Sequence, residues 1–259
     1  LPITTQWEQI IEKTSLGKLI FQTYESISKS QILNVEVNGR MRSFQIPVKT
    51  VFSTLPPRTL EIPNGSTLSS LSPFNQLNSI ESTAHLDMND DTMGHFALIL
   101  LDDVESIIRD IRVDKDSVFA SFIRMIKPGE SLLKLSVLSG LGIQEFKLFA
   151  NHLVYWRRAK AILPVSSRNT YIVSPMAPIK KIYDDSVRFN RHFPNLPSIS
   201  TFLSMVSDIS NSKPKPISVL IPSRDHRDLY LDAITWLLKY GYLVQLCSFF
   251  YLKITKKIK

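Results

Sequence analysis

Residues 152–175 read HLVYWRRAKAILPVSSRNTYIVSP, and this stretch decides the fold that we expect. Arg157, Arg158 and Lys160 follow an apolar-periodic segment, and basic residues are typical of the last turn of a helix. The run AKAILPV, the polar turn SSRN and the run TYIVSP come next and predict two strands joined as a hairpin. A helix followed by a hairpin is typical of the last helix and wing of a winged helix-turn-helix module.

The residues upstream complete this module. SVFASFIRMI (117–126) has helical spacing and ends at Lys-Pro-Gly, and SLLKLSVLSG (131–140) is a short helix closed by a glycine. A tight Leu-Gly turn then leads into IQEFKLFANHLVYWRRA (143–159). The apolar stripe of this third helix consists of Ile143, Phe146, Phe149 or Ala150, Leu153 and Trp156. We therefore predict a winged helix over residues 117–178, with Trp156 in its core.

The opposite face of the third helix leaves three readings open. Gln144, Lys147, Asn151 and Arg158, with Arg168 at the tip of the predicted wing, could donate to base edges and phosphates of DNA. Leu148 and Tyr155 fall on the same face, and apolar and aromatic residues beside arginine favour a protein interface. A solvated face without a partner is the third reading. The predicted partner-contact residues are Lys147, Leu148, Asn151, Tyr155, Arg157, Arg158 and Arg168.

The first 52 residues predict helices and an incomplete sheet. Residues 7–27 show helical spacing, with a break expected near Thr14–Gly17. Strands at 32–37 and 41–47 flank Asn38-Gly39, the strongest short hairpin signal. A two-stranded ribbon is marginal by itself, so we expect these strands to pair with further strands from elsewhere.

Residues 53–95 are rich in Ser, Thr, Asn and Pro and predict a long polar loop. His85, Asp87, Asp90, Asp91 and His95 lie in it, but their spacing matches no metal-binding motif, so we expect solvated side chains and no metal.

A strand and a helix at 96–116 follow this loop. FALILLDD (96–103) reads as a buried strand, and VESIIRDIRV (104–113) reads as a helix. Asp102, Asp103 and Glu105 are expected to serve the helix N-terminus, because the phosphate loop that accompanies magnesium-binding aspartates is absent.

Residues 179–259 predict a second α-rich region that resembles a less complete winged helix. ISTFLSMVSDI (199–209) and HRDLYLDAITWLLKY (226–240) are expected helices, and 242–254 is an expected strand run. The inward residues of the second helix should be Leu229, Ile234, Leu237 and Leu238. SRDHR (223–227) collects Ser, Asp and His, but members of a catalytic triad converge from separate elements, so we expect helix capping by Ser223 or Asp225.

Bulk composition excludes few functions. The chain has 259 residues and a formal net charge of +8, which permits contact with phosphates, an anionic membrane or an acidic protein. Its single cysteine, Cys247, lies in an apolar run and predicts a buried thiol in a reducing compartment. No secretory signal, membrane-spanning run or catalytic motif is apparent, and a start at Leu1 favours a fragment of a longer protein.

Three blocks of the chain resemble the nitrogen permease regulator 3 family: NHLVYWRRAKAILPVSSRNTYIVSPMAPI, HFPNLPSISTFLSMVS and IPSRDHRDLYLDAITWLLKYGYLVQL. TSLGKLIFQTYESISKSQILNVEVNGRMRSFQIP resembles the end of that family's amino-terminal longin domain, whose first strands would precede Leu1. The resemblance therefore implies an α+β fold: the carboxy-terminal part of a longin-type domain at 1–52, the variable loop at 53–95, a returning segment at 96–116, then winged-helix modules at 117–178 and 179–259.

The resemblance also implies a function. Members of the family are non-catalytic subunits of the complex called SEACIT in fungi and GATOR in animals. That complex stimulates GTP hydrolysis by a Rag-type GTPase and restrains target-of-rapamycin kinase complex 1 during amino-acid or nitrogen starvation. The implied partners are the nitrogen permease regulator 2 subunit, through a longin–longin heterodimer, the large DEP-domain subunit and, indirectly, the GTPase. No cofactor and no specific nucleic acid is expected.

The implied location is the cytoplasm, peripheral on the vacuolar or lysosomal membrane. The family's arginine finger belongs to the sister subunit, and no motif assigns that role to Arg58. The alternative from another class is a winged-helix DNA-binding regulator, and an enzyme ranks third.

Overall fold

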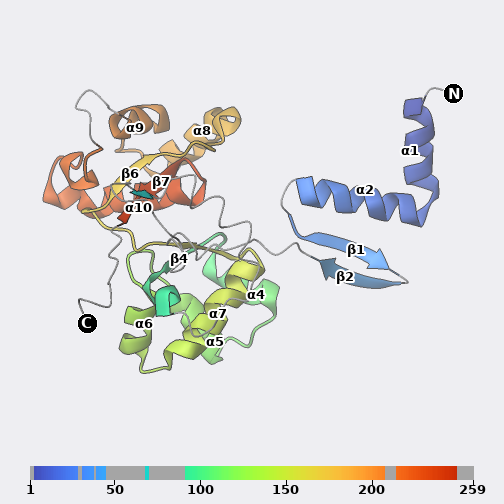
Figure 1. Cartoon of the computed structure of the whole chain (residues 1–259), viewed down its shortest axis with the longest axis horizontal. Helices are drawn as coiled ribbons and strands as arrows, with labels where there is room; N and C mark the ends of the chain where they lie inside the picture. The colour runs from blue at the N-terminus through green and yellow to red at the C-terminus, as the bar shows by residue number, and fades with distance from the viewer. Residues whose placement is uncertain are drawn as a thin grey trace, which may run out of the picture. The chain divides into compact units, whose positions relative to one another are not determined.

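The computed structural model describes residues 3–28, 31–37, 39–44, 68–69, 91–207 and 214–249. It is a mixed α+β structure with small antiparallel sheets, shown in Figure 1. The chain divides into two compact units, Leu1–Val48 and Lys49–Lys259. The predicted residues Arg58, His85, Asp87 and Asp90, and most of the loop at 53–95, lie outside the described residues.

The first unit consists of two helices and a hairpin. Its elements are α1 (Ile3–Lys13), α2 (Ser15–Ser28), β1 (Leu33–Val37) and β2 (Arg40–Phe44). The predicted helix break is confirmed at Thr14, whose hydroxyl donates to the Ile10 carbonyl (2.7 Å) and accepts from the Gly17 amide (3.1 Å). The predicted hairpin is also confirmed, because Val37 pairs with Arg40 and Gly39 supplies the positive φ of 71° that a two-residue turn needs.

The second unit begins with a module that we call the first module, residues 91–162. Its elements are η1 (Asp91–His95), β4 (Ala97–Leu100), α4 (Val104–Ile111), α5 (Val118–Met125), α6 (Leu132–Ser139), α7 (Ile143–Tyr155) and β5 (Ala159–Ile162). Side-chain caps begin three of these helices: Asp103, which was predicted to serve the N-terminus of α4, accepts from the Glu105 amide, Ser117 accepts from Ala120 and Ser131 from Lys134. Met93 is buried in this module's core, so the prediction of a polar loop reaching residue 95 is wrong for η1.

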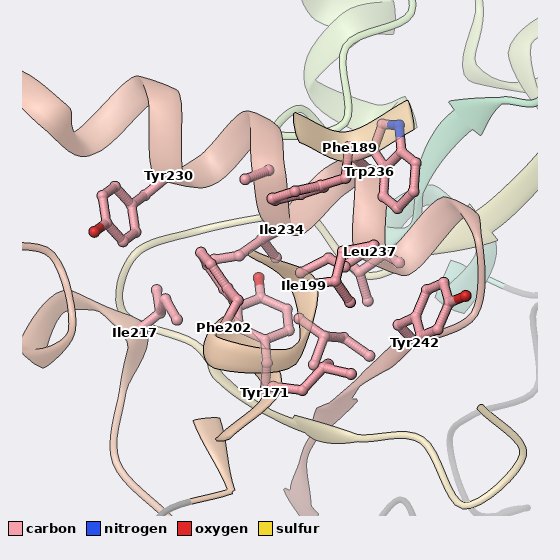
Figure 2. Packing of buried hydrophobic residues seen from close by; sticks show 14 of the residues in the cluster. Tyr171, Phe189, Ile199, Phe202, Ile217, Tyr230, Ile234, Trp236, Leu237 and Tyr242 are labelled. Atoms are coloured by element: carbon pink, nitrogen blue, oxygen red, sulfur yellow. The ribbon is translucent and has the colours of Figure 1, made fainter. Parts of the chain in front are cut away.

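The second module, residues 170–246, is also enclosed by a first and a returning strand, but its described residues form three α-helices between them where the first module has four. Its elements are β6 (Thr170–Val173), η2 (Ile179–Lys181), α8 (Ile182–His192), α9 (Ile199–Val206), η3 (Ile217–Val219), η4 (Arg224–His226), α10 (Arg227–Lys239) and β7 (Leu243–Leu246). Figure 2 shows Phe189, Phe202, Trp236 and Tyr242 filling its core. Of the residues predicted to point inward, Ile234, Leu237 and Leu238 are buried and Leu229 packs at the edge of the core.

The prediction that 159–165 and 170–175 form one hairpin is wrong. β5 pairs with β4, antiparallel, with Ala97 opposite Ile162, and β6 pairs with β7, with Val173 opposite Leu243. Each strand thus closes its own module by pairing with the strand at that module's other end. The remaining short pair joins β3 (Leu68–Ser69) to β8 (Ser248–Phe249).

Residues 163–169 connect the modules, and we call them the strap. The Val165 amide donates to the Pro128 carbonyl of the first module (2.9 Å). The carbonyls of Ser167 and Asn169 accept from Ser218 and Ile217 of the second module (2.8 and 3.0 Å). The strap is therefore held to both modules by backbone hydrogen bonds.

The β4–β5 sheet contributes to both cores because successive side chains of a strand point to opposite faces. Leu98, Ala159 and Ala161 lie in the core of the first module, whereas Ile99 lies in that of the second and Ile162 packs against it. The two modules therefore share one sheet and form one continuous unit.

Candidate protein-interaction site

Helix α7 holds most of the residues that the sequence nominated for partner contact. Its inner face, Phe146, Ala150 and Leu153, is fully buried. Phe122 of α5 packs edge-on against Phe146 with ring centroids 4.8 Å apart, and Phe119 stacks on Phe149 at 4.8 Å. This aromatic layer fixes the helix, so the direction of each outer side chain is set by the core.

Lys147 was predicted on the solvent face, and this prediction is wrong. Its side chain is buried, with 2% of its surface exposed. Lys147 follows Ile143 by four positions and precedes Ala150 by three, which places it over the same face as the apolar stripe. The long aliphatic stem of a lysine can cover apolar surface, which makes such a position tolerable.

Leu148 and Tyr155 lie on the exposed face of α7, with 51% and 46% of their surfaces accessible. Neighbouring helix α6 also exposes apolar side chains, namely Leu133, Val137 and Leu138. Val137 is 75% exposed and follows Leu133 by one helical turn. The outer faces of α6 and α7 therefore present aliphatic and aromatic groups of the kind found in the cores of protein interfaces.

Asn151 and Trp156 lie between the inner and outer faces of α7. Asn151 is half-buried, and its Oδ1 accepts no hydrogen bond from the described residues. Trp156 was predicted in the core but is only half-buried. The Trp156 amide still donates to the His152 carbonyl (3.0 Å), but at the C-cap its side chain lies at the edge of the stripe, where its ring packs edge-on against Tyr155 at 5.3 Å.

Arg157 and Arg158 follow the last residue of α7, and the first closes the helix through its backbone while the second pairs through its side chain. Arg157 adopts a left-handed backbone conformation with φ 52°, its amide donates to Val154 (3.0 Å), and that of Arg158 donates to Leu153 (2.8 Å). This is a Schellman ending, in which glycine is the usual left-handed residue. Arg158 was predicted to contact an external partner, but its guanidinium pairs with Asp102 (3.3 Å) and Asp110 (3.1 Å) of its own module.

Arg168 is exposed but belongs to the strap, in a turn where its amide donates to the Ser166 hydroxyl. The three cations predicted to contact DNA therefore have different surroundings. Lys147 is buried, Arg158 is ion-paired within its module, and Arg168 is exposed on the strap. The structure does not bring the three onto one solvent-facing surface of α7.

Lys160 makes a contact that the sequence did not reveal. Its Nζ donates to the carbonyl of Leu238 in α10 (3.0 Å), so a strand of the first module caps a helix end of the second. Burial lowers the pKa of the Lys160 ammonium below its ordinary value. The alternation of AKAI placed Lys160 opposite the two alanines, but the element that it would face could not be read from the sequence.

The first unit exposes large apolar side chains on both helices and on β2. Val35 is its one buried hydrophobic residue among those whose exposure is described, and all five residues of β2 are exposed. Its exposed hydrophobic residues are Trp7, Ile10, Leu16, Ile20, Tyr24, Ile27, Met41 and Phe44. In α2, positions 16, 20, 24 and 27 form one continuous stripe.

The described residues offer no catalytic or metal-binding arrangement. They contain no group of three or more His, Cys, Asp or Glu side chains able to hold a metal ion. The Ser223 hydroxyl lies 2.7 Å from His226 Nδ1, three residues away in an exposed turn. The prediction that Ser223 or Asp225 caps the helix is wrong, because no side chain caps η4 or α10 and the two run into each other at Arg227.

None of the described helices is long and apolar enough to cross a membrane.

Comparison with known proteins places this arrangement in one family. The family model "Nitrogen Permease regulator of amino acid transport activity 3" matches residues 1–259. The chain is 48% identical to nitrogen permease regulator 3 of Candida albicans over 96% of the chain and 37% of that protein. It is 48% identical to the Scheffersomyces stipitis protein, over 97% of the chain and 37% of the relative. It is 36% identical to the Aspergillus terreus protein, over 99% and 31%. The chain thus spans about a third of the length of these relatives.

Proposed function

Because the chain belongs to the nitrogen permease regulator 3 family, we propose that it forms part of a non-catalytic subunit of a GTPase-activating complex. The names of the relatives support a regulator of amino-acid permease signalling. In the proposed role the complex acts on a Rag-type GTPase and inhibits target-of-rapamycin kinase complex 1 during amino-acid or nitrogen starvation, which promotes autophagy. It works in the cytoplasm, peripheral on the vacuolar membrane.

The observation that carries this proposal is the exposed apolar surface of the first unit. Eight large hydrophobic side chains of that unit are more than a third exposed, while Val35 is the one described as buried. A helix pair and a two-stranded ribbon with this surface cannot be stable without a cover. We propose that residues 1–52 end a longin-type domain, and that further strands and the longin domain of the nitrogen permease regulator 2 subunit cover these faces.

We propose a second contact on the first module, for the large DEP-domain subunit. Leu148 and Tyr155 of α7, with Leu133 and Val137 of α6, supply its apolar part. Arg157 and Asn151 adjoin this face and supply polar contacts, while Arg158 holds the helix end in place through its two carboxylates. The winged-helix assignments at 117–178 and 179–259 are part of this proposal, with β4 and β7 as the strands that complete their sheets.

Hydrolysis of GTP by the Rag-type GTPase, measured with the reconstituted complex, tests the non-catalytic role. We expect hydrolysis to be stimulated by the complete complex and not by this subunit alone, and the Arg157→Ala and Arg168→Ala variants should leave the maximal rate unchanged. A loss of more than about a hundredfold in either variant, with the complex intact, would mean that this chain carries the catalytic arginine.

The alternative of a DNA-binding regulator has a separate test. Binding to duplex DNA is measured across a salt series with the Lys147→Ala/Arg158→Ala/Arg168→Ala variant beside the unaltered protein. A net charge of +8 predicts weak binding that is blind to sequence, is lost as salt rises, and persists in part in the variant. Tight sequence-specific binding that disappears in the variant would favour the DNA-binding function.

A further inference from the structure

Residues 176–192 form an exposed surface on the second module, which we call the α8 face. It includes η2 and α8 and the turn before them. Met176 is 88% exposed, Ile179 57%, Tyr183 80% and Val187 50%. Tyr183 and Val187 lie one turn apart on the side of α8 opposite Phe189, which is buried in the core, and Ile179 lies just before them in η2.

Cations are interleaved with these apolar groups. Lys180, Lys181, Arg188 and Arg191 are all exposed, and Arg191 continues the row of Tyr183 and Val187 by one further turn. The only exposed acidic residue of this segment is Asp184. The face therefore combines protruding apolar groups with a net positive charge.

The second acidic residue of α8 is withdrawn from the surface. Asp185 is 5% exposed, and its Oδ2 accepts a hydrogen bond from the Tyr242 hydroxyl (2.8 Å), while its other oxygen lies 3.7 Å from Arg188. Tyr242 itself is buried in the second core (Figure 2). Because this carboxylate pairs with Tyr242 and Arg188, the cations left to the outer side are Lys180, Lys181 and Arg191.

The α8 face differs from the exposed face of α6, where Lys134 is neutralised by Glu130 at 2.6 Å and the outward residues are otherwise aliphatic. The α6 face has the composition of a protein contact. Lysines are depleted from protein interfaces, whereas lysine and arginine beside aromatic and aliphatic groups on a short helix are typical of a helix lying on an anionic lipid surface.

We propose that the α8 face docks on the surface of an anionic membrane. Tyr183, Met176 and Ile179 enter the boundary between headgroups and acyl chains, and Lys180, Lys181 and Arg191 lie over the headgroups. Side chains exposed to this degree protrude, which suits a deformable lipid surface. This inference rests on the peripheral membrane location proposed above and assigns the membrane contact to the α8 face.

The test uses the full-length protein in its complex and two kinds of vesicle, phosphatidylcholine alone and phosphatidylcholine with phosphatidylserine. Co-sedimentation is measured for the unaltered protein and for Lys180→Ala/Lys181→Ala/Arg191→Ala. Three exposed cations of the first module, Arg109, Lys115 and Lys127, are replaced by alanine in a control variant with the same change in charge. We expect binding to the anionic vesicles only, weakened on the order of a hundredfold by the α8 variant and less than about fivefold by the control.

A second variant, Tyr183→Ser/Val187→Ser, tests the apolar part of the contact. We expect it to weaken vesicle binding even in high salt, where the charged contacts are screened. Equal losses in the α8 and control variants, or no binding of the intact complex to anionic vesicles, would overturn the proposal. If the intact complex does not bind anionic vesicles but the α8 variant no longer binds an acidic protein that the unaltered protein binds, the α8 face is the contact for that protein. Co-purification with the sister subunit is measured in parallel, and it fails only if the proposed function fails.

Discussion

Two arginines, Arg112 and Arg157, occupy the left-handed position at the ends of α4 and α7, with φ of 57° and 52°. A left-handed conformation costs a residue with a Cβ atom about 1–2 kcal/mol, and glycine avoids that cost. Both helices therefore end in a conformation that their residues do not favour by themselves. The backbone bonds that close each end, from Val113 to Ile108 (3.1 Å) and from Arg158 to Leu153 (2.8 Å), offset the strain.

Arg112→Gly should raise the free energy of unfolding by up to about 1 kcal/mol, because relief of strain outweighs the larger backbone entropy that glycine loses on folding. Arg157→Gly should give a smaller gain, since it also removes a half-buried guanidinium beside α7. Urea denaturation of both variants measures the difference. Equal stabilisation by the two would show that the Arg157 side chain contributes nothing to the fold.

Leu153 and Trp156 test where the core of the first module ends. Leu153 is fully buried, so Leu153→Ala should cost about 2–5 kcal/mol. Trp156 is half-buried, so Trp156→Ala should cost about 1–2 kcal/mol despite the larger side chain. Leu148→Ala, on the exposed face, is the control and should change stability by less than about 0.5 kcal/mol. A larger loss for Trp156→Ala than for Leu153→Ala would contradict the position described for Trp156.

At the scale of elements, one buried hydrogen bond ties α8 to the residue before β7. The Tyr242 hydroxyl donates to Asp185, and burial together with this bond raises the pKa of Tyr242 well above its usual range. Tyr242→Phe should cost about 1.5–3 kcal/mol, because it leaves a buried carboxylate without its donor. A double-mutant cycle with Asp185→Asn isolates the pair, and a coupling energy near zero would contradict the bond.

This pair also predicts a dependence on pH. A tyrosine whose pKa is higher in the folded state stabilises the fold fully below its unfolded pKa of about 10, and the stabilisation is lost as pH rises above that value. The free energy of unfolding should therefore fall from pH 9 upward to about pH 11, and less steeply in Tyr242→Phe. Tyr171 and Cys247, whose pKa values burial also raises, add to the fall, whereas Lys160, whose pKa burial lowers, opposes it. Identical slopes for both proteins would exclude Tyr242 as the source.

The helices, caps and turns were predictable because their signals are local. Ser117 and Ser131 marked helix starts, Gly140 marked an end, and Asn38-Gly39 marked the hairpin. Helix α8 was missed, although Ile182, Asp185 and Phe189 have helical spacing, because one of its three inward residues is an acid. Strand pairing is non-local: β5 lies nearer to β6 in sequence than to β4, but β5 pairs with β4 and β6 pairs with β7.

The candidate site was less predictable than the fold. Leu148 and Tyr155 are exposed, as the helical spacing indicated, but Lys147 and Arg158 are used inside the module. A spacing pattern gives the face of a helix, not the partners that distant segments bring to it. The carboxylates that pair with Arg158 belong to Asp102, between β4 and α4, and to Asp110 of α4. Both are about 50 positions away in sequence from Arg158, which follows α7, so local spacing could not reveal them.

At the scale of the whole molecule, the two units differ in how completely they bury their apolar groups. The second unit has two cores that share the β4–β5 sheet, and Lys160 and the strap connect them. The first unit leaves Trp7, Ile20 and Tyr24 exposed and has an edge strand, β2, with every residue exposed. An exposed edge strand with apolar neighbours is a site for pairing with another polypeptide or for aggregation.

Co-purification of the full-length protein with the proposed partner, a nitrogen permease regulator 2 subunit, tests the central claim most directly. The protein is expressed alone and with the partner, unaltered and as Ile20→Asp/Tyr24→Asp, with Val137→Asp/Leu138→Asp of α6 as the control. We predict aggregation or low yield alone, a monodisperse complex with the partner, loss of that complex in the α2 variant and its retention in the control. A monodisperse monomer that neither needs nor retains the partner, and that is unchanged by the α2 variant, would contradict the account.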